Sequence, residues 1–345
     1  MKKIVLRGSS FDIGRQLGEF GRNAWHQKVT RTALWQTVTA LTDSAQVQEM
    51  RASVTARFPA IWQELEGLAA GLEADIDAVF AWNCRGDLVR STSDGCTTVA
   101  GVTDSGERLI AHNEDGFPQL RPDCALVEVA PDEGVAFLSF AYPGSICGHT
   151  FAVNAKGVVN TVNNIRAVDR PAGMPRQVLA RAALNAATLD EAIAILTSTP
   201  RAGAFHHTLG QMGDERLFSV EATGTGCSVQ PLTGRFGHAN HLIHPSLAQI
   251  EQVITDSSAS RQQRLQAWST SPAQPDADQA LAMLSDQQNE SLPIYRLSDA
   301  DPDEENTLAT IIFTLSAHKL EWALYGLDRR QPERQGSLSQ GDFHS

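Results

Sequence analysis

The segment from Asp94 to Gly116 constrains the fold more than any other part of the sequence, because it has the pattern of a β-hairpin. Two short runs of alternating apolar and polar residues flank a turn at residues 104–106, as in two antiparallel strands joined by a tight connection. In such a pair, the start of one strand lies beside the end of the other. We therefore expect Cys96 and Asp115 to be neighbours, so that a thiol, an amide and carboxylates meet at one end. The strands are expected at residues 97–103 and 108–113.

Two motifs in this hairpin resemble a known family. The motif GCTT at residues 95–98, followed by HNED at residues 112–115, resembles the self-processing N-terminal-nucleophile hydrolases related to acyl-CoA:6-aminopenicillanic acid acyltransferase. Matching fragments follow one another in order along nearly the whole chain, and such an ordered set is much more specific than a single motif. These fragments are residues 8–14, 83–85, 154–163, 237–241 and 257–264.

Composition excludes several classes of partner. The chain has 345 residues and a net charge of −12, whereas a nucleic-acid partner needs a surplus of Lys and Arg on one face. No apolar run approaches membrane-spanning length, and the apolar run before Arg7 has only three residues, too few for a signal-peptide core. Five scattered Cys without a CxxC pair argue against a disulfide framework. We expect a cytoplasmic protein with a small-molecule substrate and no nucleic-acid or membrane partner; the sequence leaves a homo-oligomer open.

The order of the expected elements indicates an α+β domain. Residues 1–95 have mainly helical periodicity, most clearly at 58–72, and strands dominate from Cys96. The strands at 307–315 and 320–327 are expected to form a closing hairpin, and residues from Arg329 are polar and expected to form a loose tail. Such an order favours two sheets packed face to face with helices outside, and the family resemblance implies the four-layer αββα fold. Later helices are expected at 176–185, 189–197, 246–268 and 276–284, and strands at 125–130, 135–140, 149–154, 157–163, 205–210, 215–221, 226–231, 234–240, 307–315 and 320–327.

Cys96 is the expected nucleophile. A thiol with a pKa of about 8.5 needs a base at neutral pH, and in the N-terminal-nucleophile plan the residue's own α-amine, with a pKa of about 8, is that base. This amine exists only after the Gly95–Cys96 bond is cut, and Gly95 lacks the Cβ that would hinder the thiol. We therefore expect self-cleavage into fragments 1–95 and 96–345, which together form one domain. The alternative is a small buried hydrophobic Cys96 in an uncleaved chain.

The resemblance implies roles for four further residues. Asp115 matches the carboxylate that aligns the nucleophile, and Asn240 matches a side-chain donor to the oxyanion. Asn163 resembles an active-site amide that positions the substrate, and Arg296 is a candidate for a cation that favours the thiolate. The alternatives are a turn role for Asp115 and, for Arg296, a surface ion pair with the acidic residues 299–305.

A metal site is the rival interpretation of three histidines. His238, His241 and His244 are spaced by three, but metal ligands at that spacing rely on a helix, and Gly237 and Pro245 bracket the run. No Asp, Glu or Cys nearby completes a ligand set. We expect neither a metal nor an organic cofactor.

The HNED motif also bears on the substrate. Penicillin acyltransferase has an aromatic residue where this chain has Glu114, whereas relatives that hydrolyse β-alanyl amides of biogenic amines have a similar HNED. Glu114, with Asn113 and His112, would bind an aminoacyl ammonium group, and the alternative is a solvated charge in a turn. The expected activity is hydrolysis of a small N-acyl or β-alanyl amine through a Cys96 thioester. Acyl transfer to an amine, and an uncleaved binding protein of the same fold, remain open.

Overall fold

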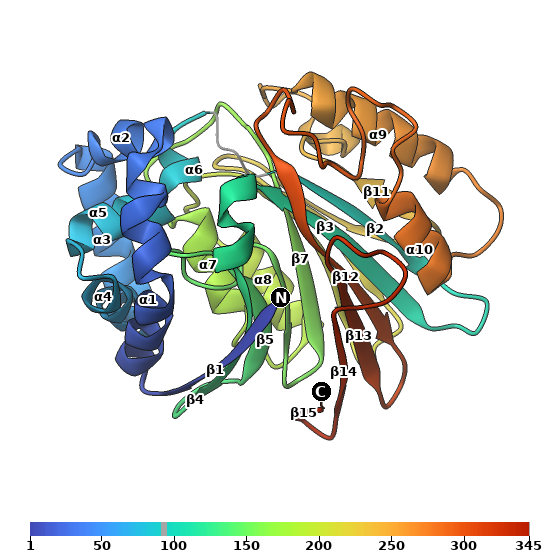
Figure 1. Ribbon diagram of the computed structural model, residues 1–345, viewed down its shortest axis with the longest axis horizontal. Helices are drawn as coiled ribbons and strands as arrows, with labels where there is room; N and C mark the ends of the chain where they lie inside the picture. Colours follow the sequence, from blue (N-terminus) through green and yellow to red (C-terminus); the bar gives the residue numbers. More distant parts are fainter. Residues whose placement is uncertain (91–94, 345) are drawn as a thin grey trace.

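Two β-sheets pack face to face at the centre of the protein, and helices cover the outer face of each sheet (Figure 1). The computed structural model describes residues 1–90 and 95–344, so Asp94, where the predicted hairpin segment begins, lies outside the described residues. The layers follow in the order helices, sheet, sheet, helices. This order confirms the predicted α+β class and four-layer αββα arrangement.

The described part of the larger sheet has eight strands, mostly antiparallel to their neighbours. The exception is the pair of β1 and β4, which run parallel. In sheet order the strands are β1 (Lys2–Gly8), β4 (Ala125–Pro131), β5 (Phe137–Ala141), β6 (Phe151–Asn154), β7 (Val158–Asn164), β8 (Phe205–Gln211), β9 (Leu217–Ala222) and β10 (Cys227–Pro231).

The described part of the smaller sheet has seven strands and contains the predicted hairpin, formed by β2 and β3. In sheet order its strands are β11 (Phe236–His238), β2 (Cys96–Val102), β3 (Arg108–Gly116), β12 (Asn306–Leu315), β13 (Leu320–Tyr325), β14 (Arg334–Ser339) and β15 (Asp342–His344).

Helices from residues 10–197 cover the larger sheet, and later helices cover the smaller one (Figure 1). The first layer consists of α1 (Ser10–Gln27), α2 (Ala33–Thr39), α3 (Ala45–Arg57), α4 (Pro59–Leu72), α5 (Ile76–Asn83), α6 (Arg85–Leu88), α7 (Arg176–Ala183) and α8 (Leu189–Thr197). The second consists of α9 (Asp256–Ser269) and α10 (Ala277–Leu284), and short 3₁₀ helices span Val29–Arg31, Pro118–Asp123 and Pro245–Leu247.

Glycines set the close approach of α1 and α4. A Cβ on Gly14 would lie 1.9 Å from the carbonyl oxygen of Glu64, and one on Gly67 would lie 2.0 Å from that of Phe11. Gly18 and Gly71 repeat this arrangement one turn further along. The two backbones therefore touch directly, which only glycine permits.

Three predicted elements differ from the structure. The chain begins with β1 before its helices. The helix predicted at 246–268 begins ten residues later than expected, as α9 at Asp256, because Thr255 caps it by accepting from the Ser258 backbone N–H. The prediction of a loose tail from Arg329 was wrong, because β14 and β15 extend the smaller sheet and Leu338 is buried.

Two further features concern the predictions that the protein has no disulfide framework and no membrane-spanning segment. All five cysteines are free thiols, and Cys227 alone among them is exposed. No helix of the described residues has the length and apolar character needed to cross a bilayer.

Candidate active site

The expected nucleophile, Cys96, is the first residue of β2, an interior strand of the smaller sheet. The antiparallel register pairs Cys96 with Glu114 and Thr98 with His112. Paired residues project on one side of a sheet, so these four side chains share a face. Thr98 Oγ1 donates to Asn163 Oδ1 of β7 over 2.8 Å, which shows that this face is turned towards the larger sheet.

The alternate residues of the hairpin face the helices of the second layer. Arg261 of α9 donates from Nη1 to Thr97 Oγ1 over 3.0 Å. Asn113 Nδ2 donates to the Leu284 carbonyl at the end of α10 over 2.8 Å, and Asn113 Oδ1 accepts from Thr310 Oγ1 over 2.5 Å. Asn113, expected to bind substrate, thus has both ends of its amide engaged on the opposite face of β3 from Cys96.

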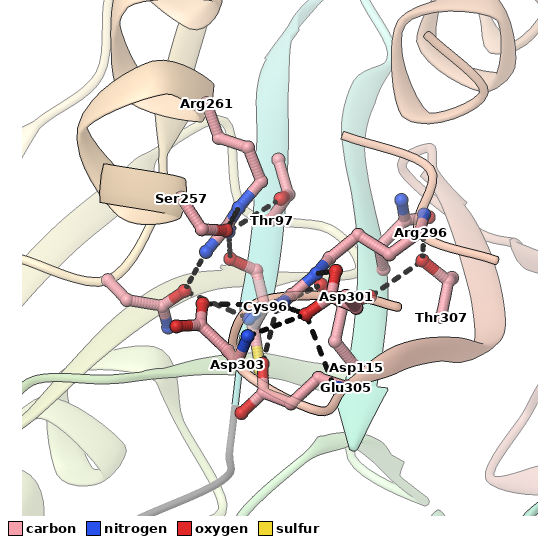
Figure 2. A network of polar contacts seen from close by, with 12 residues as sticks. Cys96, Thr97, Asp115, Ser257, Arg261, Arg296, Asp301, Asp303, Glu305 and Thr307 are labelled. Atoms are coloured by element: carbon pink, nitrogen blue, oxygen red, sulfur yellow. Dashed lines mark hydrogen bonds and ion pairs between the residues drawn. The ribbon is translucent and has the colours of Figure 1, made fainter. Parts of the chain in front are cut away.

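The backbone of Cys96 is held by Asn240 and Arg261, and Figure 2 shows Arg261 reaching towards Cys96. The Cys96 N–H donates to Asn240 Oδ1 over 3.0 Å, and Arg261 donates from Nη1 to the Cys96 carbonyl over 2.5 Å and from Nη2 to Asn240 Oδ1 over 2.8 Å. Asn240 Nδ2 donates to the Asn164 carbonyl over 3.0 Å. Since all these side chains are buried, the amide beside the nucleophile is rigidly oriented.

The carboxylate beside the thiol belongs to Glu114. Cys96 Sγ lies 3.7 Å from Glu114 Oε2, and His112 Nε2 lies 3.2 Å from the same oxygen. The other oxygen, Oε1, accepts from Tyr142 Oη over 2.8 Å. Burial lowers the pKa of His112 to about 3, so its imidazole is neutral at physiological pH. Glu114 is buried, not the solvated turn charge of the alternative interpretation.

Asp115 lies one residue further along β3 than the partner of Cys96. Its backbone N–H donates to the Gly95 carbonyl over 2.9 Å. Its Oδ1 accepts from Thr307 Oγ1 over 2.7 Å, and Oδ2 lies 3.7 Å from Arg296 Nη1 with no hydrogen-bond partner among residues 1–90 and 95–344. Burial raises the pKa of Asp115, and the cations of Arg296 and Arg261 oppose that rise.

Arg296 is the centre of a buried cluster of charges (Figure 2). It pairs with Asp301, with Asp303 at 3.2 Å and with Glu305 at 2.5 Å. The alternative of a surface ion pair with residues 299–305 was right about the partners and wrong about exposure, since the Arg296 side chain is 1% exposed. Burial also raises the pKa of Glu305 to about 7, although Arg296 opposes this effect.

Asn163 connects the candidate site to a buried network of histidines. Its Oδ1 accepts from Thr98 and lies 3.0 Å from His206 Nδ1, and its Nδ2 donates to the His238 carbonyl over 3.2 Å. The rings of His206 and His238 stack with centroids 3.5 Å apart. His238 Nε2 lies 2.9 Å from Glu221 Oε1. Asn163 therefore joins the two sheets behind the hairpin.

The ligand atoms that converge are not those of the three spaced histidines. Their hydrogen-bond partners include Glu221 for His238, Ser258 for His241 and Ser219 for His244, and Glu221 also lies 3.9 Å from His244 Nδ1. Within the described residues, the set that could hold a metal ion is Cys96, His112 and Glu114, whose ligand atoms lie within 4.8 Å of one another. A thiol, an imidazole and a carboxylate are zinc ligands, but the same three groups serve acyl transfer without a metal.

A cavity of about 640 Å³ opens beside the Arg296 cluster. Carboxylates of Asp256, Glu290, Asp301 and Asp303 line it together with the apolar Leu292, Pro293 and Leu297. Two of these carboxylates also pair with Arg296, whose guanidinium neighbours Asp115. The cavity therefore favours a small cationic ligand that also has apolar surface.

Four residues that contact the candidate site were not among the predicted site residues. Arg261 falls in a motif that marked the resemblance, but no role was derived for it. Thr98 follows Cys96 by two positions in a strand, a spacing that places both on one face. Tyr142 follows β5 of the larger sheet, and Thr307 lies in β12. Both are far from Cys96 in the sequence, and no local pattern indicates that they contact the site.

Comparison with known proteins identifies relatives along most of the chain. The family model for acyl-coenzyme A:6-aminopenicillanic acid acyl-transferase matches residues 102–326, beginning after Cys96. The β-alanyl-dopamine/carcinine hydrolase of Drosophila melanogaster is 24% identical, over 92% of this chain and 91% of that protein. The 40 kDa form of the acyl-coenzyme A:6-aminopenicillanic-acid-acyltransferase of Emericella nidulans is 24% identical, over 77% of this chain and 75% of that protein.

A solved structure was also found. A mutant of the conjugated bile acid hydrolase from Clostridium perfringens has a TM-score of 0.47 and 12% identity, covering 71% of this chain and 92% of that one. The extent of the family match shows what kind of protein this is. The chain is an enzyme of the amide-hydrolase and acyltransferase kind, and it belongs to the acyl-coenzyme A:6-aminopenicillanic acid acyl-transferase family.

Proposed function

We propose that the protein is a self-processing cysteine amidase that opens a small N-acyl or β-alanyl amine through a thioester on Cys96. The observation that carries this proposal is the environment of Cys96. Its nitrogen is fixed by Asn240, its carbonyl by Arg261, and its thiol lies 3.7 Å from a carboxylate, all in a buried site. A structural cysteine would pack among apolar groups instead.

Self-cleavage between Gly95 and Cys96 would produce fragments 1–95 and 96–345. The new α-amino group of Cys96 would then take the thiol proton, and the thiolate would attack the substrate carbonyl. Loss of the amine leaves a thioester, which water hydrolyses to release the acid and restore the thiol. The five free thiols fit a reducing compartment such as the cytoplasm.

Several side chains would support this reaction. We infer that Asn240, held by Arg261, would donate from Nδ2 to the oxyanion, in exchange for its present hydrogen bond to the Asn164 carbonyl. Asn163 orients the hairpin side of the site through Thr98. Asp115 and Arg296 form the charged pair behind Gly95, which would align the α-ammonium group.

The acidic cavity beside the Arg296 cluster supports the proposed substrate class. Four carboxylates in a space of about 640 Å³ suit a substrate that carries an ammonium group. Glu114 is less suited to this role than the sequence suggested, since both its oxygens already have buried partners. The relative from Drosophila melanogaster is named a hydrolase of β-alanyl-dopamine and carcinine, which supports the proposal.

Acyl transfer to an amine is the second candidate, and the relative from Emericella nidulans favours it. Hydrolysis and transfer share every residue named above and differ only in what attacks the thioester. Partitioning of a radiolabelled acyl group between acid and new amide, measured with and without an added amine, separates the two activities.

Intact mass spectrometry tests the proposal most directly. The wild-type protein should yield a fragment beginning at Cys96, and Cys96→Ala should remain a single chain without activity on β-alanyl amines. Wild type that stays at full length and does not react with thiol reagents would instead support an uncleaved binding protein of the same fold.

A further inference from the structure

Self-cleavage has a chemical need that the mature enzyme does not have. Before the Gly95–Cys96 bond is cut, the nitrogen of Cys96 is an amide whose lone pair is delocalised. It cannot remove the thiol proton, so the α-amine that serves the mature amidase is absent from this first step. The uncut chain therefore requires another base close to Sγ.

We propose that Glu114 is this base, and that His112 and Tyr142 position it. The inference rests on the proposed function, because it concerns the step that would create the amidase. Glu114 Oε2 lies 3.7 Å from Cys96 Sγ, since the hairpin register places the two residues opposite one another. Of the two adjacent carboxylates in β3, this is the one on the same face as the thiol.

The surroundings of Glu114 orient its carboxylate. Tyr142 Oη donates to Oε1 over 2.8 Å, and His112 Nε2 lies 3.2 Å from Oε2. The His112 ring is fixed in turn, because its Nδ1 lies 2.8 Å from Thr98 Oγ1. A further titratable group near Glu114 is Cys124, whose pKa is raised by burial and by Glu114 itself, so it remains a neutral thiol.

The carbonyl that the thiol would attack already has a donor. The Asp115 backbone N–H donates to the Gly95 oxygen over 2.9 Å, and this is the oxygen that becomes negatively charged. The hairpin thus supplies the base from the side chain of Glu114 and the oxyanion donor from the backbone of the next residue.

Self-cleavage would proceed by an N→S acyl shift followed by hydrolysis of the thioester. The Sγ–H proton passes to Glu114 while Sγ bonds to the Gly95 carbonyl carbon, whose oxygen becomes an oxyanion. The C–N bond then breaks, the proton passes from Glu114 to the Cys96 nitrogen, and an amine and a thioester result. Water adds to the Gly95 carbon and the C–S bond breaks, which leaves a carboxyl group on Gly95 and a free thiol on Cys96.

Pulse-labelling in a cell-free translation reaction, followed on a denaturing gel, tests the proposal with the full chain. Glu114→Gln keeps the shape of the side chain and removes the base, so cleavage should slow by about 100-fold or more. The matched control is Glu221→Gln, which changes another buried glutamate with a histidine partner and should cleave at the wild-type rate. Cleavage of Glu114→Gln at the wild-type rate would overturn the proposal.

The pH dependence separates a base from a structural role. The rate of wild-type cleavage should decline at acidic pH as Glu114 takes a proton. The rate for Glu114→Gln should instead rise with pH in proportion to the fraction of thiolate. Tyr142→Phe keeps the carboxylate but removes a donor that favours its charged form, so the acidic limb should move to higher pH. This variant decides the question if Glu114→Gln does not fold, and an unchanged profile would then overturn the proposal.

The two proposals fail in different ways. A wild-type chain that never cleaves contradicts the proposed function. A wild-type chain that cleaves, with Glu114→Gln folded and equally fast, contradicts only the role of Glu114.

Discussion

Glu114 and Asp115 are adjacent in β3, yet their carboxylates lie on opposite faces of the sheet. Glu114 faces the larger sheet beside the Cys96 thiol, and Asp115 faces Thr307 and Arg296. This alternation gives one dipeptide two distinct environments. It also fits two separate proposed tasks, in which Glu114 acts before the chain is cut and Asp115 aligns the amino group afterwards.

Gly95→Ala should slow self-cleavage by at least about tenfold. A Cβ at this position would lie 2.1 Å from Glu305 Oε2 and 2.6 Å from Arg296 Nη1, so the scissile carbonyl or the charged pair must move. The time course of fragment formation on a denaturing gel measures the effect. Gly234→Ala is the control, since a Cβ there meets nothing within 4 Å, and equal rates for the two variants would contradict the explanation.

Arg261→Lys should lower amidase activity by about ten- to a hundredfold. Arg261 holds the Cys96 carbonyl and Asn240 Oδ1 with different nitrogens, and a single ammonium group cannot reproduce this fork. Steady-state kinetics of the mature protein with a β-alanyl amine should show the loss mainly in kcat.

Arg264→Lys provides the control for this prediction. Arg264 lies one turn further along α9 and pairs with Asp286, away from Cys96. It should leave kcat within about twofold of the wild type, and an equal loss in both variants would point to damage of the helix instead.

Buried histidines should make the fold sensitive to acid. Burial lowers the pKa of His207 to about 3, whereas in the unfolded chain this residue titrates near 6.5. Between these pH values the unfolded state binds more protons, so the free energy of unfolding falls as pH falls. Glu305 and Asp87, whose pKa values burial raises to about 7 and 6, act in the opposite direction.

A variant isolates the contribution of His207. In a Cys96→Ala background that stays intact, His207→Gln should weaken the pH dependence by about 1.4 kcal/mol per pH unit between pH 6.5 and pH 3. Urea denaturation at several pH values measures this slope. The exposed His318→Gln should leave the slope unchanged, and a similar slope in all three proteins would refute the prediction.

Gly67→Ala should destabilise the fold by about 1–3 kcal/mol, because its Cβ would lie 2.0 Å from the Phe11 carbonyl in the facing helix. Ala is otherwise the better helix former, so any loss reflects the contact between helices. The exposed Ala70→Gly in the same helix should cost about 1 kcal/mol through propensity alone. Denaturant unfolding compares them, and a stabilised Gly67→Ala would show that α1 and α4 can separate.

The hairpin could be predicted from sequence because it depends on local alternation and a short turn. Its register could not, since the turn geometry decides whether Cys96 faces Glu114 or Asp115, and the structure pairs Cys96 with Glu114. Glu114 therefore received a substrate-binding role in the sequence interpretation, whereas the pairing places it against the thiol. Tyr142, which fixes that carboxylate, follows a strand of the other sheet, and no pattern within the hairpin indicates it.

The edges of the fold were the least predictable. Residues 334–344 are mostly polar and resemble a disordered tail, yet they pair with β13 through the backbone, which carries no sequence signature. β1 is equally inconspicuous, because only Leu6 in it is fully buried. Strong local periodicity indicated the helix at 58–72 and the closing hairpin, where the apolar face is continuous.

The pairing of β1 with β4 has a consequence for the mature enzyme. Residues 2–8 would belong to one product of the cut and residues 125–131 to the other, yet they hydrogen-bond along their whole length. The shorter fragment would thus stay bound to the longer one, because its strand β1 is part of the larger sheet. The two fragments should co-elute in gel filtration and separate only in denaturant. The cut would therefore create a new chain end without releasing a peptide.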